Sequence, residues 1–239
     1  MPALAENLAQ VETAISAACR AAGRTREEVE LIAVSKNHPT SAIVEALGLG
    51  LHLFGENRVQ EFAAKSSELI AAGVRDRISA HLIGHLQSNK AAKAAEIFDA
   101  VDSVDSLKLA ERLDEAAGRL GKRLPVLMEI KLSHEETTSG LVPDSRELSE
   151  LLEKLPSLAN LDAQGLMTIA PLDVSEEETR ACFRSLRLLR DRLAQAHSRL
   201  HLPVLSMGMS GDFSLAIVEG ATRIRVGTAL FGVRPGYPK

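Results

Sequence analysis

Ser206–Asp212, with the sequence SMGMSGD, follows the short apolar run Pro203–Leu205 and precedes the amphipathic segment Phe213–Glu219. A short continuous apolar run predicts a buried strand, and the segment after SMGMSGD predicts a helix that ends at Gly220. The stretch is therefore a loop of small residues between a strand and a helix. Such a loop turns several backbone N–H groups toward one point, where an anion such as a phosphate binds. The alternative is a tight turn in which Ser210 only caps the helix.

The same order of strand, loop and helix recurs along the whole chain. Seven further strands are predicted, and segments with apolar residues three or four apart separate them. The eight predicted strands are Leu31–Ser35, Leu51–Phe54, His81–Ile83, Ile97–Val101, Pro125–Leu132, Leu161–Met167, Pro203–Leu205 and Thr222–Val226. This alternation predicts a parallel sheet with right-handed crossovers. Eight such units favour one α/β domain over residues 1–239, closed as a (β/α)8 TIM barrel, with an open doubly wound sheet as the alternative.

Composition narrows the class of protein. The formal net charge of -4 gives no general attraction to nucleic acid or to an anionic membrane. No apolar run is long enough to span a bilayer, and the N-terminus lacks the blocks of a signal peptide. The two cysteines, Cys19 and Cys182, are too few for a disulfide framework. We therefore expect a cytoplasmic protein that binds neither nucleic acid nor membranes.

In a (β/α)8 barrel the C-terminal ends of all the strands form one rim, where the functional residues collect. The residues at or near these ends are Lys36, Asn57, His85, Met167, Ser210 and Arg225. The loops after the seventh and eighth strands often hold phosphate in such barrels. They would place Met209 and Ser210 beside Gly227 and Thr228. This position favours the anion-binding interpretation of SMGMSGD.

Lys36 ends the first predicted strand. A lysine in that position is often a surface residue whose amine reaches solvent. In the mouth of a barrel, however, burial and the nearby Arg225 favour a neutral amine, which attacks aldehydes to form a Schiff base. An amine and a phosphate site on one rim predict a phosphorylated aldehyde, with pyridoxal 5′-phosphate (PLP) as the leading candidate. A Schiff-base sugar-phosphate aldolase is a weaker alternative, because its lysine generally lies on a later strand.

Three further polar residues are considered as functional groups. His81 and His85 are candidates for metal ligands or proton carriers, but no partner lies at a metal-ligand spacing, so no metal is predicted. Glu56 is a candidate base, with capping of the next helix as the commoner role.

Several motifs occur together in this chain. They are Ala33–Lys36 (AVSK), Phe54–Asn57 (FGEN), His81–Gly84 (HLIG), Leu86–Lys90 (LQSNK), Gly165–Met167 (GLM), Ser206–Ser210 with Asp212, and Arg225–Thr228 (RVGT) with Phe231 and Gly232. In this combination the chain resembles the pyridoxal phosphate homeostasis proteins (the YggS/PROSC family), single-domain relatives of the alanine racemase barrel. The resemblance covers nearly the whole chain.

The resemblance implies a role for each matching residue. Lys36 would carry PLP as an internal aldimine, Arg225 would face the pyridine nitrogen, and Asn57 would lie near the ring. The phosphate would be bound by Ser210 and by backbone amides of Met209, Ser210, Gly227 and Thr228. The implied function is to bind, store and deliver PLP, with apo forms of PLP-dependent enzymes as acceptors. Members often have a lysine shortly before the glycine of the loop after the fifth strand, where this chain has Thr138-Ser139-Gly140, so that lysine's role does not carry over.

The chemistry argues against a racemase of fold type III, which is the alternative function. Arg225 cannot accept a proton, so the pyridine nitrogen would stay neutral and would be a poorer electron sink. Racemases similar to this barrel use a tyrosine from an additional β-domain and a partner subunit. The only tyrosine here is Tyr237, in the terminal tail, and no residues remain for that domain. We therefore expect a PLP-binding protein without catalytic activity, and a monomer.

Overall fold

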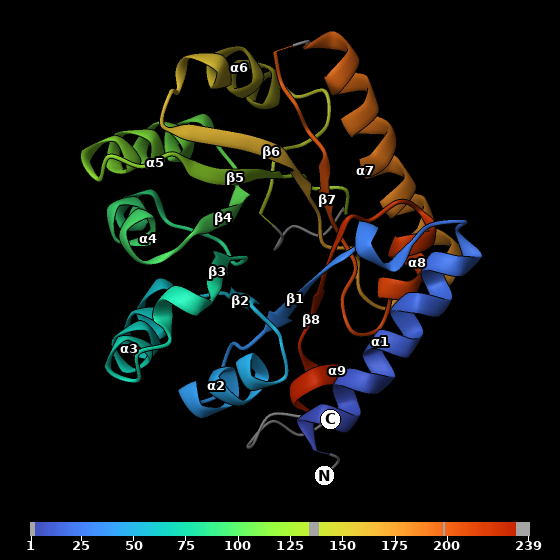
Figure 1. The fold of residues 1–239 in the computed structure, drawn as a ribbon. Coiled ribbons are helices and arrows are strands. Elements are labelled where there is room, and N and C mark those ends of the chain that lie inside the picture. The colour runs from blue at the N-terminus through green and yellow to red at the C-terminus, as the bar shows by residue number, and fades with distance from the viewer. Residues whose placement is uncertain (1–2, 134–138, 198, 233–239) are drawn as a thin grey trace.

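The structure is a computed structural model that describes residues 3–133, 139–197 and 199–232. In these residues eight parallel strands pair in chain order, and the last pairs with the first to close a barrel (Figure 1). The strands are β1 (Glu30–Val34), β2 (Leu53–Glu56), β3 (Ser79–Leu82), β4 (Ala100–Val104), β5 (Leu124–Glu129), β6 (Leu161–Met167), β7 (Val204–Ser206) and β8 (Arg223–Val226). The predicted (β/α)8 barrel is confirmed. The open doubly wound sheet is wrong, because Leu31 of β1 lies in register with Ile224 of β8.

Helices surround the barrel and cover its outer side (Figure 1). They are α1 (Leu4–Ala21), α2 (Thr40–Gly48), α3 (Val59–Ala71), α4 (Ala91–Ile97), α5 (Leu107–Arg119), α6 (Arg146–Lys154), α7 (Glu176–Ala196), α8 (Phe213–Val218) and α9 (Thr228–Phe231). The first helix, α1, precedes β1 and packs against α8 and α9. The beginning and the end of the described chain therefore meet on one side of the barrel, next to the loops that follow β7 and β8.

Serine caps begin several of these helices. The Ser106 hydroxyl accepts a hydrogen bond from the backbone N–H of Leu109 at the start of α5. At the start of α7, the Ser175 hydroxyl accepts from the Glu178 amide, and the Glu178 carboxylate accepts from the Ser175 amide. Such caps satisfy amide groups that have no partner inside the first helical turn. The caps thereby fix the residue at which each of these helices begins.

The fourth strand lies later in the chain than the sequence indicates. The prediction is 97–101, whereas β4 begins at Ala100. Ile97 instead ends α4. The apolar pattern placed the strand too early, because Asp102 and Ser103 in the middle of β4 are polar and yet fully buried. A strand that faces the polar interior of a barrel does not show a continuous apolar run.

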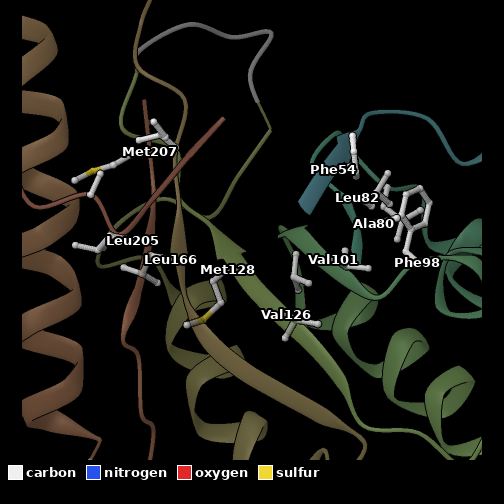
Figure 2. Close-up of a cluster of buried hydrophobic side chains, with 14 of the residues drawn as sticks. Phe54, Ala80, Leu82, Phe98, Val101, Val126, Met128, Leu166, Leu205 and Met207 are labelled. Carbon is white, nitrogen blue, oxygen red and sulfur yellow. The ribbon is translucent and has the colours of Figure 1, made fainter. Parts of the chain in front are cut away.

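Side chains of the strands alternate between the barrel interior and a layer beneath the helices. The outer layer is apolar. Figure 2 shows part of it, including Phe54, Ala80, Leu82, Phe98, Val101, Val126, Met128, Leu166, Leu205 and Met207. In β8, Ile224 belongs to this layer, whereas Arg223 and Arg225 on either side of it do not. Arg223 reaches across the interior to Asp102, with Nη1 3.6 Å from Oδ2. The alternation in β8 thus delivers two buried arginines to the inside of the barrel.

Candidate functional site

A cavity of about 410 Å³ opens at the C-terminal ends of the strands. All seven predicted site residues line it, namely Lys36, Asn57, Met209, Ser210, Arg225, Gly227 and Thr228. The other lining residues are Val34, His38, Ile83, Gly84, Ile169 and Gly211. Residues from the beginning and the end of the chain share this cavity because β1 lies between β2 and β8 in the closed barrel.

The loop Ser206–Asp212 is tied to the loop after β8. The Ser210 hydroxyl accepts hydrogen bonds from the backbone amides of Gly227 and Ala229, at 3.3 and 3.2 Å. The N-cap of α8 is Asp212, so the interpretation of Ser210 as a plain cap is wrong. Ser210 instead joins the two loops, because the helix begins two residues further on than a Ser210 cap would require. The predicted juxtaposition of the two loops is therefore present.

Backbone geometry gives this loop its shape. Gly208 has a φ of 92°, which residues with a side chain rarely adopt, and a Cβ there would lie 2.6 Å from that of Ala216. The Asp212 carboxylate accepts from the Met209 amide at 2.5 Å. Within the described residues, the amides of Ser210 and Gly211 donate to no acceptor. Both residues line the cavity, so the loop presents N–H donors to an anion.

Arg225 is fixed on the inner side of the cavity. Its Nη1 donates to the Ser206 hydroxyl at 2.8 Å and its Nη2 to the Thr168 carbonyl at 2.7 Å. Burial lowers the pKa of the guanidinium, while the nearby carboxylates of Asp102 and Glu129 oppose that shift. A guanidinium remains protonated even so. The cavity therefore contains a fixed cation that donates hydrogen bonds and accepts no proton.

Asn57 is held in the cavity wall by close packing. Gly84 lies against it, and a Cβ on Gly84 would come within 2.5 Å of the Asn57 carbonyl oxygen. The side-chain oxygen of Asn57 is buried and has no hydrogen-bond partner among the described residues. An unpaired buried amide oxygen costs free energy, typically about 1–3 kcal/mol. A ligand that pairs with the amide would remove that cost.

Glu56 has neither of its predicted roles. It does not cap α3, and it is absent from the cavity lining. It is fully buried, with Oε1 2.8 Å from Lys65 Nζ and 2.7 Å from the Ser35 hydroxyl. Burial raises the pKa of this carboxyl, against the opposing effect of Lys65 and Ser35. This burial could not be predicted, because a Glu followed by a Lys nine residues later is an ordinary surface pattern.

The two candidate histidines pair with carboxylates of β4 or of the residue that follows it. His81 Nδ1 lies 3.0 Å from Asp102 inside the barrel, and His85 Nδ1 lies 2.9 Å from Asp105. Over residues 3–133, 139–197 and 199–232, no group of three metal-binding side chains comes together. Met167, named as a rim residue, is buried at the end of β6.

Some residues at the site carried no signal in the sequence, and others lie outside the described structure. His38, Ile83 and Ile169 line the cavity from loops or strand ends. A single apolar residue or histidine in a loop has no pattern that would indicate this role. Thr138 and Tyr237, which entered the argument about function, lie outside the described residues.

A larger hollow, of about 860 Å³, occurs at the opposite end of the barrel and is lined by residues such as Glu30, Asp162 and Arg223. None of the seven predicted site residues lines it. The N-terminal end of a (β/α)8 barrel contributes mainly to stability, so the smaller cavity is the candidate site.

Comparison with known proteins agrees with the geometry. Residues 3–235 match the model of the alanine racemase N-terminal domain, which defines the class of barrel. The chain is 42% identical over 234 residues to the pyridoxal phosphate homeostasis protein of Pseudomonas aeruginosa, covering 98% of this chain and 97% of that protein. It is 42% identical over 233 residues to the protein of the same name from Escherichia coli K12, covering 97% of each. The chain therefore belongs to the family of the pyridoxal phosphate homeostasis proteins.

Solved structures are also similar. PipY of Synechococcus elongatus PCC7942, solved with PLP bound, is 45% identical with a TM-score of 0.82, covering 96% of this chain and 100% of that one. Alanine racemase of Clostridium difficile 630 has a TM-score of 0.74 at 20% identity, covering 99% of this chain and 57% of that one. The latter likeness shows the fold alone. In the described part of the chain, no helix combines the length and apolar character needed to cross a membrane.

Proposed function

We propose that this protein binds PLP in the 410 Å³ cavity and serves in PLP homeostasis, holding the cofactor and delivering it without catalysing a reaction. In this proposal residues 1–239 form one PLP-binding barrel domain. One observation carries the proposal: Lys36, Arg225 and the amide-rich loop at Ser210 face a single cavity. The PLP-bound state of the similar PipY supports it.

The residues in the cavity fit the chemical groups of PLP. When bound, PLP supplies an aldehyde that condenses with a primary amine, forming a C=N bond with loss of one water. Lys36 is the amine in the cavity, and it must lose a proton to solvent before it attacks. The backbone amides of Ser210, Gly211 and Thr228 would donate to the phosphate, while the Gly227 amide, bonded to the Ser210 hydroxyl, holds the two loops together.

Two further side chains fit the ring. Arg225 would donate a hydrogen bond to the ring nitrogen. Because a guanidinium accepts no proton, it would leave that nitrogen unprotonated. The unpaired amide of Asn57 offers a hydrogen bond near the ring, which would satisfy its buried oxygen or, with the amide rotated, its NH₂ group.

The same residues support the absence of catalysis. A neutral ring nitrogen stabilises a carbanion poorly, and two-base proton transfer needs a second base. The described lining contains neither a tyrosine nor a carboxylate. His38, whose ring centroid is 5.1 Å from that of Phe231, is the remaining titratable group beside Lys36 and Arg225. A fold-type-III racemase is therefore the second candidate, and it depends on His38.

Borohydride reduction tests the site. The protein is incubated with PLP, reduced, digested and analysed by peptide mass spectrometry. We expect a pyridoxyl group on Lys36 and its loss in Lys36→Ala. A label on another lysine contradicts the assignment, and an adduct with a ketose phosphate in place of PLP supports the aldolase.

Isotope exchange separates the homeostasis protein from the racemase. D- and L-amino acids are incubated with the PLP-loaded protein in deuterated water. We expect no incorporation of deuterium at Cα at a catalytic rate. Incorporation that disappears in His38→Ala would establish the racemase.

The proposal extends to cellular context. We propose that the protein is a cytoplasmic monomer whose acceptors are apo forms of PLP-dependent enzymes. Loading an apoenzyme from the PLP-bound protein, faster than from the same concentration of free PLP, would demonstrate delivery. Light scattering of the purified protein gives the oligomeric state.

A further inference from the structure

The turn that carries Lys36 has a constrained backbone. This Lys36 turn, residues 35–38, begins directly after β1, and the His38 amide donates to the Ser35 carbonyl at 3.0 Å. Asn37 has a φ of 61°, a left-handed conformation that few residues other than glycine adopt. The chain thus bends sharply at the residue after Lys36, in a conformation that asparagine adopts more readily than most residues with a side chain.

Lys65 of α3 reaches this turn from outside the cavity. Its Nζ donates to the Ser35 carbonyl at 2.9 Å and to the Oε1 atoms of Glu56 and Glu61, both at 2.8 Å. The three N–H donors of an ammonium group are thereby all used. Lys65 is only 7% exposed, and it is absent from the cavity lining. It therefore serves as a fixed cation and not as a second reactive amine.

Its two carboxylate partners also contact the Lys36 turn. Glu56 accepts a hydrogen bond from the Ser35 hydroxyl at 2.7 Å, and Glu61 accepts one from the Asn37 backbone amide at 2.5 Å. The residue before Lys36 is therefore bonded to Glu56 and Lys65, and the residue after it is bonded to Glu61, while Lys65 joins the two carboxylates. Because Glu56 is fully buried, the loss of one partner leaves the others without compensation.

We propose that Glu56, Glu61 and Lys65 form an ionic clamp that positions Lys36 for covalent attachment of PLP. The inference rests on the proposed function, and it assigns to these three side chains a role in that same site. They are positioning residues, because they bond to the neighbours of Lys36 and not to the cavity. They affect the approach of the Lys36 amine to the aldehyde carbon. A displacement of the amine by about 1 Å lowers the efficiency of its reaction by up to about 100-fold.

Two ligands separate positioning from general stability. PLP forms a covalent bond to the amine, whereas pyridoxine 5′-phosphate has the same ring and phosphate but an alcohol in place of the aldehyde. Equilibrium binding of both ligands is measured for the wild type, Lys65→Met and Leu69→Ala. Leu69 is the matched control, because it is fully buried in the same helix and makes none of the clamp's hydrogen bonds.

We expect Lys65→Met to weaken PLP binding by roughly 10- to 100-fold and to leave pyridoxine 5′-phosphate binding at the wild-type value. Leu69→Ala is expected to lower Tm while the ratio of the two affinities stays at the wild-type value. An unchanged ratio in Lys65→Met, or an equal loss for both ligands, overturns the clamp.

A second variant covers the case in which Lys65→Met does not fold. Glu61→Ala removes the bond to the Asn37 amide together with the contact to Lys65, and it keeps the buried pair of Lys65 with Glu56. The Glu61 side chain is 22% exposed. We expect PLP binding to weaken by roughly 3- to 10-fold, the value of one hydrogen bond, with pyridoxine 5′-phosphate unaffected. Faster hydrogen exchange at the Asn37 amide of the ligand-free protein would accompany it. A wild-type ratio in this variant overturns the clamp as well.

Lys36→Ala distinguishes the failure of the clamp from the failure of the proposed function. If Lys36→Ala changes the ratio of the two affinities and the clamp variants do not, only the clamp is wrong. If Lys36→Ala also retains the wild-type ratio, or the wild type binds neither ligand, the proposed function fails.

Discussion

The two sides of the cavity are held by different kinds of interaction. The phosphate side, made of residues 206–212 and 227–229, is held by hydrogen bonds of the Ser210 hydroxyl, of backbone amides and of the Asp212 carboxylate, and by the conformation of Gly208. The amine side, the Lys36 turn, is held by buried charges on Glu56 and Lys65. Neutral hydrogen bonds each contribute about 1 kcal/mol and do not titrate, whereas a broken buried ion pair costs about 3–5 kcal/mol. The difference predicts which side of the site fails first when it is perturbed.

The largest effect is expected on the amine side. Glu56→Ala leaves the Lys65 ammonium buried without its main partner, and we expect the free energy of unfolding to fall by about 3–5 kcal/mol. Urea denaturation measures it. Glu115→Ala is the control, because Glu115 pairs with Arg112 and Arg119 on the exposed surface of α5 and is expected to change stability by at most about 0.5 kcal/mol. Equal effects of the two substitutions would remove the contrast between the sides.

Gly208→Ala tests the conformation of the phosphate side. The left-handed φ of 92° and the clash with Ala216 both oppose a side chain there, so we expect a loss of about 2–3 kcal/mol. Gly211→Ala, five residues after the end of β7 in the same loop, is the control for stability, since a Cβ there meets nothing within 4 Å. Thermal denaturation is measured for both. A harmless Gly208→Ala would show that the loop does not depend on its glycine.

Ser210→Ala removes the bond between the two phosphate loops. The amides of Gly227 and Ala229 lose their common acceptor, and we expect pyridoxine 5′-phosphate binding to weaken by about 1–2 kcal/mol. Ser214→Ala, on an exposed face of α8, is the matched control with no expected effect. The rate of covalent attachment at saturating PLP is expected to stay at the wild-type value, because the Lys36 turn is untouched. A slower rate would mean that the two sides are not independent.

Sequence patterns sufficed for the barrel and for seven of the residues that line the cavity, but not for His38, Ile83 and Ile169. Alternating apolar runs and helical periodicity fixed the order of the elements, and barrel geometry then placed Lys36 beside the loop at Ser210. Boundaries failed where a strand faces the polar interior, as at Asp102 in β4. Gly84 appeared only as part of a motif, although its lack of a Cβ is what admits Asn57 to the wall.

The support of the Lys36 turn could not be predicted. Glu61 and Lys65 have the i,i+4 spacing of an ordinary exposed ion pair. Whether such a pair is on the surface or buried depends on which side of α3 packs against the barrel. Glu56 was expected to cap a helix, and its burial could not be predicted either. That burial results from the closure of the barrel and not from the neighbouring residues in the chain.

The smallest expected effect is in the pH dependence of stability, where two carboxylates that share Lys65 should act in opposite directions. Burial raises the pKa of Glu56 above its usual 4.5 despite Lys65 and Ser35. Burial also acts to raise the pKa of Glu61, but the bonds from Lys65 and the Asn37 amide outweigh it, so that pKa is lowered from 4.5. Each group changes the free energy of unfolding by no more than about 1.4 kcal/mol per pH unit.

The signs follow from which state binds the proton. As pH rises from about 4.5 toward the raised pKa, the folded state keeps the Glu56 proton that the unfolded state loses, so the wild type loses stability relative to Glu56→Gln. As pH falls from about 4.5 through the lowered pKa, the unfolded state takes up the Glu61 proton first, so the wild type loses stability relative to Glu61→Gln. Urea denaturation of the three proteins across the acid range measures both differences. Parallel profiles for the two variants would mean that the clamp's carboxylates titrate as one group, and the amine side would then be no more sensitive to pH than a single buried pair.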